Sequence, residues 1–145
     1  VIHHVFRPDA SLQILEVGAV LPFHATTLGK AVLAYLEDDV RADLLSETYP
    51  KLTGRTLASP KELKKEVEKV GSETEATIRE EAVLGEAGVA APVFDRRAEP
   101  IGAIGVAGPV ERVLHPDRES TVAAAVVEAA RGISRDLGAP RWPAV

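Results

Sequence analysis

Two apolar segments separated by a short polar turn constrain the fold of this chain more than any other feature. Residues 88–94 and 101–108 are rich in Val, Ile, Ala and Gly, and the intervening residues 95–99 have the sequence DRRAE. Parallel strands need a crossover of a dozen or more residues, so this short connection predicts an antiparallel hairpin. Pro92 cannot donate a hydrogen bond to a sheet. We therefore expect the first strand to lie at an edge or a bulge there.

The clearest helix signal is a capping box. Ser59 can cap free backbone amides, Pro60 fits the first turn, and Glu62 can bond back to the cap. We expect this helix to end near Gly71. Its core positions are predicted to form one apolar stripe, made of Leu63, Val67 and Val70.

Three further helices are predicted from periodicity and end signals. The first is opened by residues 24–27, and the second begins at Asp38 and Asp39, where acidic side chains favour a helix start. Asp117 is expected to cap a long last helix, which Gly138 ends. The core positions expected in these helices are Leu28, Val32, Tyr35, Leu36, Val40, Leu44, Val122, Val126, Ala130, Ile133 and Leu137.

These elements together predict an α+β fold. Residues 1–6 and 12–17 are expected to be strands, because both are short apolar segments next to turn residues. The 145 residues suffice for one domain, with a mostly antiparallel sheet that carries its helices on one face. The chain begins inside an expected strand at Val1, so we expect the domain to start upstream.

The composition excludes several classes of function. Cysteine is absent, which rules out disulfides, thiol nucleophiles and thiolate metal sites. With 22 acidic and 17 basic residues the net charge is −5, whereas DNA-binding domains usually carry a basic surface. We expect no signal peptide, and no run reaches the ~20 apolar residues of a membrane helix. The sequence therefore predicts a cytoplasmic domain with no membrane partner and no DNA contact of its own.

Three glycines in the second strand of the hairpin, Gly102, Gly105 and Gly108, suggest a phosphate-binding loop at first sight. Such a loop must lead directly into a helix, whereas we expect Pro109 and a loop to follow these glycines, so we expect no nucleotide site. By alternation, Ile101, Ala103, Gly105 and Ala107 share one face of the strand, which thus ends in Ala, Gly and Ala. Side chains this small either let a helix pack closely or form the floor of a cavity. The residues alone support both interpretations.

The histidines do not predict a metal site, and no cofactor is expected. His3 and His4 are neighbours in an expected strand and point to opposite sides, with no HxxxH spacing nearby. His24 lies at the entrance of the first helix, where free amides and the helix dipole attract anions. His24 is therefore a candidate for ligand binding, with a satisfied packing or capping role as the alternative.

No catalytic constellation is apparent, and we predict that the domain is not an enzyme. The chain has no GxSxG elbow that would present a serine nucleophile. Glu80 and Glu81 are a carboxylate pair, but neighbouring side chains diverge in a strand, which favours a solvated edge or an ion pair. Glu86 lies just before the hairpin, where its carboxylate either faces a pocket or occupies a turn.

Four motifs occur in a fixed order along nearly the whole chain. Residues 21–34 have the sequence LPFHATTLGKAVLA, and residues 55–57 have the sequence RTL. Residues 80–81 are two glutamates, followed by GVAAPVFD at residues 88–95 and IGVAGP at residues 104–109. In type and order these segments resemble the PLHATALGKALLA, RTI, EE…GVAAPVFD and LSVSGP motifs of IclR-family transcriptional regulators.

The resemblance implies a GAF-like effector-binding domain, a curved sheet flanked by helices. A winged helix-turn-helix that binds DNA as a dimer would precede it, as would the domain's first helix and strand. DNA binding is therefore expected only through a segment outside this chain. The effector would lie between the sheet and the helix that begins near His24. The residues carried over to its pocket are Thr27, Leu28, Ile78, Glu86, Gly88, Gly105 and Ala107.

Departures from the family pattern change the expected ligand. Relatives that bind small oxo-acids carry hydroxyl, thiol or Asp side chains where this chain has Ile78, Gly88, Gly105 and Ala107. A buried carboxylate without partners is strongly destabilising, so a small polar acid is disfavoured. We expect an aromatic or medium-sized organic acid instead, with Thr27 and the helix amides as its carboxylate contacts.

The leading hypothesis is therefore the ligand-binding and homo-oligomerisation domain, dimeric or tetrameric, of an IclR-type regulator. A ligand that prefers one arrangement of subunits shifts their population, and the DNA-binding segments respond. A GAF-like enzyme that turns over a small metabolite is the first alternative. A purely structural dimerisation module is the second, and it predicts no cavity beside Gly105 and Ala107.

Overall fold

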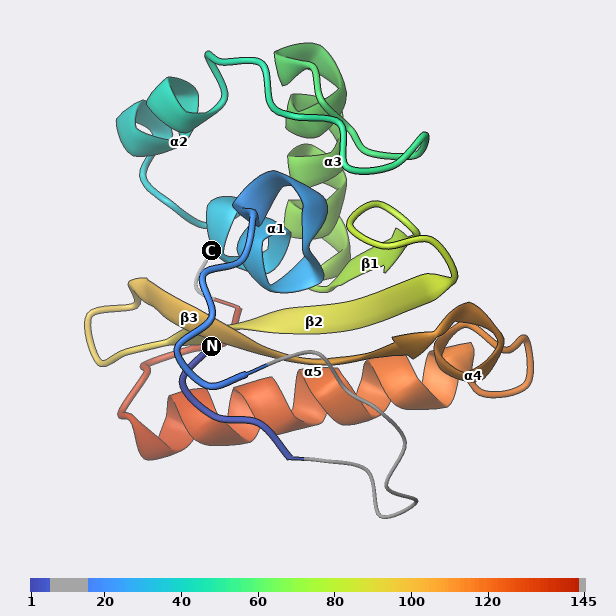
Figure 1. Cartoon of the computed structure of the whole chain (residues 1–145). Coiled ribbons are helices and arrows are strands. Elements are labelled where there is room, and N and C mark those ends of the chain that lie inside the picture. Colours follow the sequence, from blue (N-terminus) through green and yellow to red (C-terminus); the bar gives the residue numbers. More distant parts are fainter. Residues whose placement is uncertain (6–15, 144–145) are drawn as a thin grey trace.

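A computed structural model describes residues 1–5 and 16–143 of the chain. Its elements in chain order are η1 (Phe23–Ala25), α1 (Thr27–Leu33), α2 (Asp38–Leu44), α3 (Pro60–Glu73), β1 (Ala76–Arg79), β2 (Glu86–Phe94), β3 (Pro100–Pro109), α4 (Val110–Val113) and α5 (Glu119–Asp136). Figure 1 shows α1, α2 and α3 on one side of the sheet and α5 along the other. The four predicted helices and the hairpin are confirmed, and α4 stands where a loop was expected.

The sheet has three antiparallel strands in the order β1-β2-β3. β2 and β3 form the predicted hairpin. A register shift between Val93 and Phe94 marks a bulge, and β1 stops at the Ala76–Ala90 pair. Pro92 therefore lies beside the bulge, on a stretch of β2 that pairs with β3 on one side and is no longer paired with β1 on the other. There its missing N–H removes no ladder hydrogen bond.

Helices cover both faces of the sheet, which corrects the expectation that they lie on one face. Residues 87–94 of β2 are buried without a break instead of alternately. Val89 and Val93 pack against α4 and α5 on one face, while Ala90 packs with α1 and α3 on the other. An uninterrupted apolar run is typical of a strand buried on both faces, so the sequence contained this signal.

α3 begins with the capping box predicted at Ser59. Ser59 Oγ accepts from Glu62 N at 3.3 Å and donates to the Glu62 carboxylate at 2.6 Å. The hydrogen bonds with Ser59 hold the pKa of Glu62 below its ordinary value. The predicted apolar stripe is also confirmed, with Leu63, Val67 and Val70 buried.

The end of α3 differs from the prediction. Gly71 stays inside the helix, which closes three residues later at Thr74. Thr74 has a φ of 65°, in the left-handed region. That conformation commonly ends a helix, but the residue is usually glycine because a Cβ is crowded there. The helix thus ends in the left-handed conformation that is common at helix C-termini, but at a threonine instead of a glycine.

α5 differs from the prediction in its N-cap residue, and α2 differs in the burial of its side chains. Arg118, and not Asp117, precedes α5, and its side chain makes no cap. Val40 was expected in the core of α2 but is 44% exposed, because α2 lies on the outside and has no buried residue. α2 begins at Asp38 and Asp39, as the sequence predicted.

The inner face of α5 departs from the predicted stripe near its C-terminal end. Ile133 and Leu137 are 38% and 46% exposed. Ser134 is buried instead, where its Oγ donates to Ala130 O at 2.7 Å and accepts from Phe94 N at 3.0 Å. The amide of Phe94 follows the bulge and needs an acceptor, which a serine supplies. Apolar periodicity cannot show such a requirement.

The strand expected over residues 1–6 is not formed by its described part, residues 1–5. Val1 instead contacts residues 18 and 19, since its backbone nitrogen donates to Ala19 O at 2.8 Å and its carbonyl accepts from Gly18 N at 2.7 Å. Two hydrogen bonds at one residue make no strand ladder. The strand expected over residues 12–17 lies mostly outside the described residues.

Candidate functional site

The start of α1 is fixed by Thr26. Its Oγ1 accepts from Gly29 N at 3.3 Å and donates to Pro22 O at 3.0 Å, so it caps the helix and ties it to the preceding turn. Thr27, the first residue of α1, is buried as a result. The cap therefore sets the position at which α1 begins, and with it the burial of Thr27 against the sheet.

Four of the predicted site residues meet at the centre of the sheet. Ile78, Gly88 and Ala107 are paired directly across β1, β2 and β3. Thr27 lies against the middle one, since a Cβ built on Gly88 would be only 3.0 Å from Thr27 Oγ1. Glycine at position 88 is what allows α1 to come this close. At Gly88, therefore, the small residue lets a helix pack closely against the sheet.

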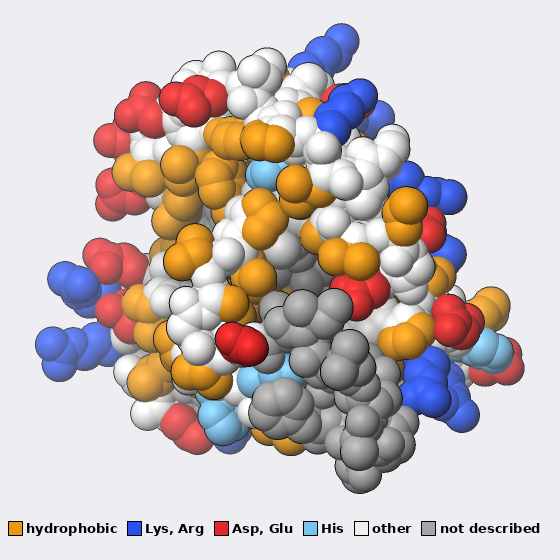
Figure 2. All heavy atoms as spheres, viewed as in Figure 1, with side chains coloured by type: hydrophobic (Ala, Val, Ile, Leu, Met, Phe, Trp, Pro, Cys, Tyr) orange, Lys and Arg blue, Asp and Glu red, His pale blue; other side chains and the backbone are white. Residues whose placement is uncertain are grey.

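On β3 the same face of the sheet is only partly exposed, since Ala103 packs against the cluster between α1 and α3. Gly105 and Ala107 are exposed, although they lie on the face that α1 covers at β2. Glu86 is exposed at its rim, two residues before Gly88. Figure 2 shows hydrophobic side chains gathered over the middle of the visible side of the molecule, with most charged side chains near its margin. We call Thr27, Gly88, Gly105 and Ala107 the candidate effector site.

His24 and Leu28 are directed elsewhere. The ring of His24 stacks on Tyr49 with centroids 4.9 Å apart, and its Nε2 lies 3.0 Å from Pro50 O. His24 is buried in this packing role, which holds the loop after α2 against η1. Leu28 packs at the edge of the cluster between α1 and α3.

An ion pair is buried between α1 and the loop that joins β1 to β2. Lys30 Nζ lies 2.7 Å from both carboxylate oxygens of Glu81. Lys30 is 0% exposed and Glu81 is 7% exposed. Burial raises the pKa of Glu81, outweighing the charge and hydrogen bond of Lys30, which lower it. The ion-pair interpretation of Glu80 and Glu81 is thus confirmed.

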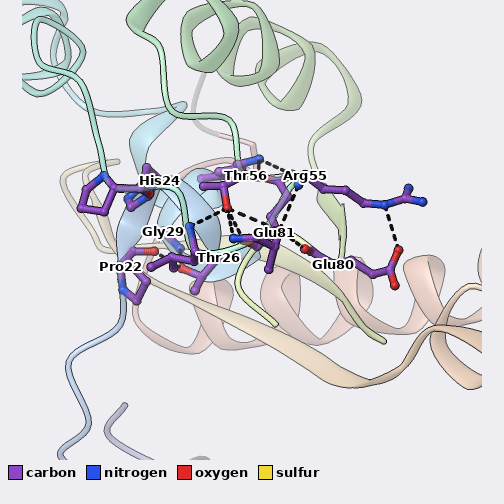
Figure 3. Close-up of polar contacts among 12 residues, drawn as sticks. Pro22, His24, Thr26, Gly29, Arg55, Thr56, Glu80 and Glu81 are labelled. Carbon is purple, nitrogen blue, oxygen red and sulfur yellow. Dashed lines mark hydrogen bonds and ion pairs between the residues drawn. The ribbon is translucent and has the colours of Figure 1, made fainter. Parts of the chain in front are cut away.

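Two threonines hold the backbone of the same loop, and one of them, Thr56, is labelled beside Glu81 in Figure 3. Thr56 Oγ1 donates to Glu81 O at 2.7 Å, and Thr53 Oγ1 donates to Glu80 O at 2.6 Å. The Glu80 carboxylate pairs with Arg55 at 2.9 Å. The segment before α3 is therefore joined to the loop after β1, which in turn is joined to α1.

Sequence reasoning did not single out Lys30, Thr53 or Thr56. A signal for Lys30 was present, because it follows Thr27 by three residues and so lies on the same inward face of the helix. A lysine there needs a buried carboxylate. The partner could not be named, because helix periodicity carries no information about a loop far along the chain.

Two recesses lie away from the candidate effector site. A groove of about 630 Å³ runs between α2 and α3, and a smaller recess of about 250 Å³ lies at the end of α5. Neither is lined by a residue predicted to bind the effector. In the part of the chain that the structure describes, no three His, Asp or Glu side chains are grouped as a metal site. Within the same residues, no helix is long and apolar enough to cross a membrane.

Most of the chain matches one known protein family. Residues 1–135 match the family model described as bacterial transcriptional regulator IclR C-terminal. The chain belongs to the IclR family. It corresponds to the effector-binding domain of these transcriptional regulators, which are not enzymes.

Curated IclR-family proteins are similar over nearly the whole chain. The Glycerol operon regulatory protein of Streptomyces coelicolor is 40% identical over 143 residues, which cover 98% of this chain and 56% of that protein. The protein of the same name from Streptomyces griseus is 41% identical with the same coverage. The Transcriptional repressor IclR of Escherichia coli K12 is 34% identical over 95% of this chain and 48% of its own length. The chain thus spans about half the length of these relatives.

Solved structures of the family share the fold. A putative IclR transcriptional regulator from Silicibacter sp. TM1040 superposes with a TM-score of 0.86 at 27% identity, covering 93% of this chain and 53% of that one. The C-terminal domain of Escherichia coli KdgR superposes with a TM-score of 0.73 at 30% identity, covering 81% and 71%. The predicted α+β, GAF-like fold of the IclR C-terminal domain is therefore confirmed.

Proposed function

We propose that a small-molecule effector binds between α1 and the β2–β3 hairpin, at the candidate effector site, and changes DNA binding by the whole regulator. The chain forms one domain of that regulator, and its DNA-binding segment lies in the part that the chain does not span. Assembly as a homodimer or homotetramer would let the ligand shift the population of subunit arrangements. The regulator acts in the cytoplasm, where bacterial DNA is located.

One observation carries this proposal. The sheet face is closed by Thr27 at Gly88 but open one strand further on, at Gly105 and Ala107. A ligand can therefore lie on β3 beside the start of α1, next to Thr27, without displacing the main core. Small, apolar side chains on that face favour an aromatic or medium-sized organic acid over a small polar one.

The relatives suggest which genes the whole regulator controls. Two proteins named Glycerol operon regulatory protein are 40% and 41% identical to this chain over 98% of its length. We infer that the whole regulator controls genes of glycerol use. Deletion of its gene should change transcript levels of a glycerol operon, and unchanged levels with and without glycerol would contradict this inference.

Replacing Ala107 with Phe tests the candidate effector site. A thermal-shift screen of aromatic acids, aliphatic acids, glycerol and glycerol phosphate would first provide a ligand, because saturation at 100 times Kd stabilises a domain by ~2.7 kcal/mol. We expect Ala107→Phe to keep the melting temperature of the free domain, since the residue is exposed, and to abolish the stabilisation. Val106→Phe is the matched control, because Val106 is also exposed but faces the opposite side of β3.

Two outcomes would contradict the proposal. Stabilisation that survives Ala107→Phe but is lost in Val106→Phe would place the ligand on the α5 side of the sheet. Conversion of the ligand by purified protein would instead support the GAF-like enzyme considered from the sequence. An effector should be recovered unchanged after incubation.

A further inference from the structure

The end of α5 and the segment that follows it form a recess on the opposite face of the sheet from α1. Its volume is about 250 Å³. It is lined by three arginines, one alanine and the single tryptophan of the chain, namely Arg131, Arg135, Ala139, Arg141 and Trp142. We call it the arginine recess. No residue of the candidate effector site contributes to it.

Trp142 gives the arginine recess a fixed aromatic wall. Its Nε1 donates to Pro92 O at 2.9 Å, and its ring packs at the edge of the cluster between α5 and β2. The guanidinium of Arg131 lies 5.5 Å from the ring centroid, within the range of a cation–π contact. A tryptophan anchored in this way offers a rigid apolar surface to a bound molecule.

The arginines of the recess keep their hydrogen-bond donors available. Arg131 lies 3.8 Å from Glu128 and Arg135 lies 3.9 Å from Asp136, long contacts between exposed side chains that stabilise little. Arg141 has no acidic partner among the described residues, and none of the three guanidinium groups donates a hydrogen bond to another described residue. Three like charges around one recess repel each other, and a bound oxyanion would relieve that repulsion.

Capping of α5 does not account for these arginines. The last carbonyls of the helix are already bonded by backbone amides, with Gly138 N 2.9 Å from Arg135 O and Ala139 N 2.9 Å from Ser134 O. Basic side chains at a helix end can serve such carbonyls, but here glycine at the left-handed position does so. The guanidinium groups are left to face the recess.

We propose that the arginine recess is a second ligand site, for a small molecule that carries a carboxylate or phosphate group. The planar guanidinium groups would bind the oxyanion, and the remainder of the molecule would lie beside Trp142. A volume of about 250 Å³ suits a molecule smaller than most drugs. The proposal does not depend on the candidate effector site.

Intrinsic fluorescence tests this directly, because Trp142 is the single tryptophan. The domain is titrated with inorganic phosphate and, separately, with benzoate, against sodium chloride at matched ionic strength, since salt screens exposed charges. We expect a saturable change with at least one oxyanion and none with chloride. Arg135→Gln and Arg141→Gln should each weaken binding about tenfold, because each removes a charge-assisted hydrogen bond. Arg118→Gln, a control at the N-terminal end of α5, should leave the affinity unchanged.

Calorimetry with the same two probes repeats the measurement without relying on the tryptophan signal. Absence of saturable binding of both probes in both measurements would overturn the proposal. An equal loss in Arg118→Gln would do so too, because it would indicate a general effect of charge. Tighter binding of duplex DNA than of either probe, lost in Arg135→Gln, would replace the proposal with a nucleic-acid contact.

Discussion

The ammonium group of Lys30 and the carboxylate of Glu81 form an ion pair inside the fold, although 51 positions separate the two residues. The pair joins α1, which carries Thr27, to the loop after β1. Removing either charge from water is costly, and each is tolerated there because the other is present. The pair thus couples the position of α1 to that of the loop.

Removal of one partner of this pair should be strongly destabilising. We expect Lys30→Met to lower the free energy of unfolding by about 3–5 kcal/mol, because Glu81 then stays buried without a partner. The double variant Lys30→Met/Glu81→Leu should recover most of that loss, since no unpaired charge remains. Urea unfolding of the three proteins measures both quantities. A single variant as stable as the original chain would show that the ion pair is not maintained in solution.

The stability of the domain should depend on pH through Glu81. Burial raises the pKa of Glu81 above its ordinary 4.5, so between 4.5 and the raised value the folded chain holds a proton that the unfolded chain releases. The contribution of Glu81 to stability is therefore full below pH 4.5 and falls as pH rises through that window. Glu81→Gln lacks this titration. The unfolding free energy of the original chain relative to Glu81→Gln should fall as pH rises. A difference that grows with pH would show that the pKa of Glu81 is lowered in the folded chain.

Thr74 carries an avoidable strain at the end of α3. Its φ of 65° is crowded for any residue with a Cβ, and more so for a β-branched one. Thr74→Gly should therefore raise the free energy of unfolding by about 1 kcal/mol. Thr74→Ala keeps a Cβ and should gain clearly less. Urea midpoints compare the two, and equal midpoints would indicate that the left-handed turn is absent in solution.

Two glycines of β3 should respond differently to alanine. A Cβ on Gly105 would lie 2.6 Å from Val89 O and 2.8 Å from Ala90 Cβ, whereas a Cβ on Gly102 would meet nothing within 4 Å. We expect Gly105→Ala to cost about 1–3 kcal/mol through the shift that it forces between β2 and β3. Gly102→Ala should stay within about 0.5 kcal/mol of the original chain. Thermal melts of both variants test this, and the reverse order would contradict the observed pairing.

The candidate site was predicted from the sequence in part. Alternation placed Gly105 and Ala107 on one face, and the pairing across the sheet confirms it. Whether that face is packed or open could not be predicted. It depends on how far α1 extends over β3, and the structure has it packed at Gly88 and open at Ala107.

Local chemistry accounts for what the amino-acid order predicted correctly. A cap at Ser59, a short polar turn between two apolar strands and a glycine after α5 each act within a few residues, so each can be recognised along the chain. Tertiary packing decided the rest. The cover on both faces of β2, the exposure of Ile133 and Leu137, and the meeting of Lys30 with Glu81 all depend on contacts between distant segments. Periodicity assigns a residue to a face of its own element, but the partner of that face is determined only when the elements pack together.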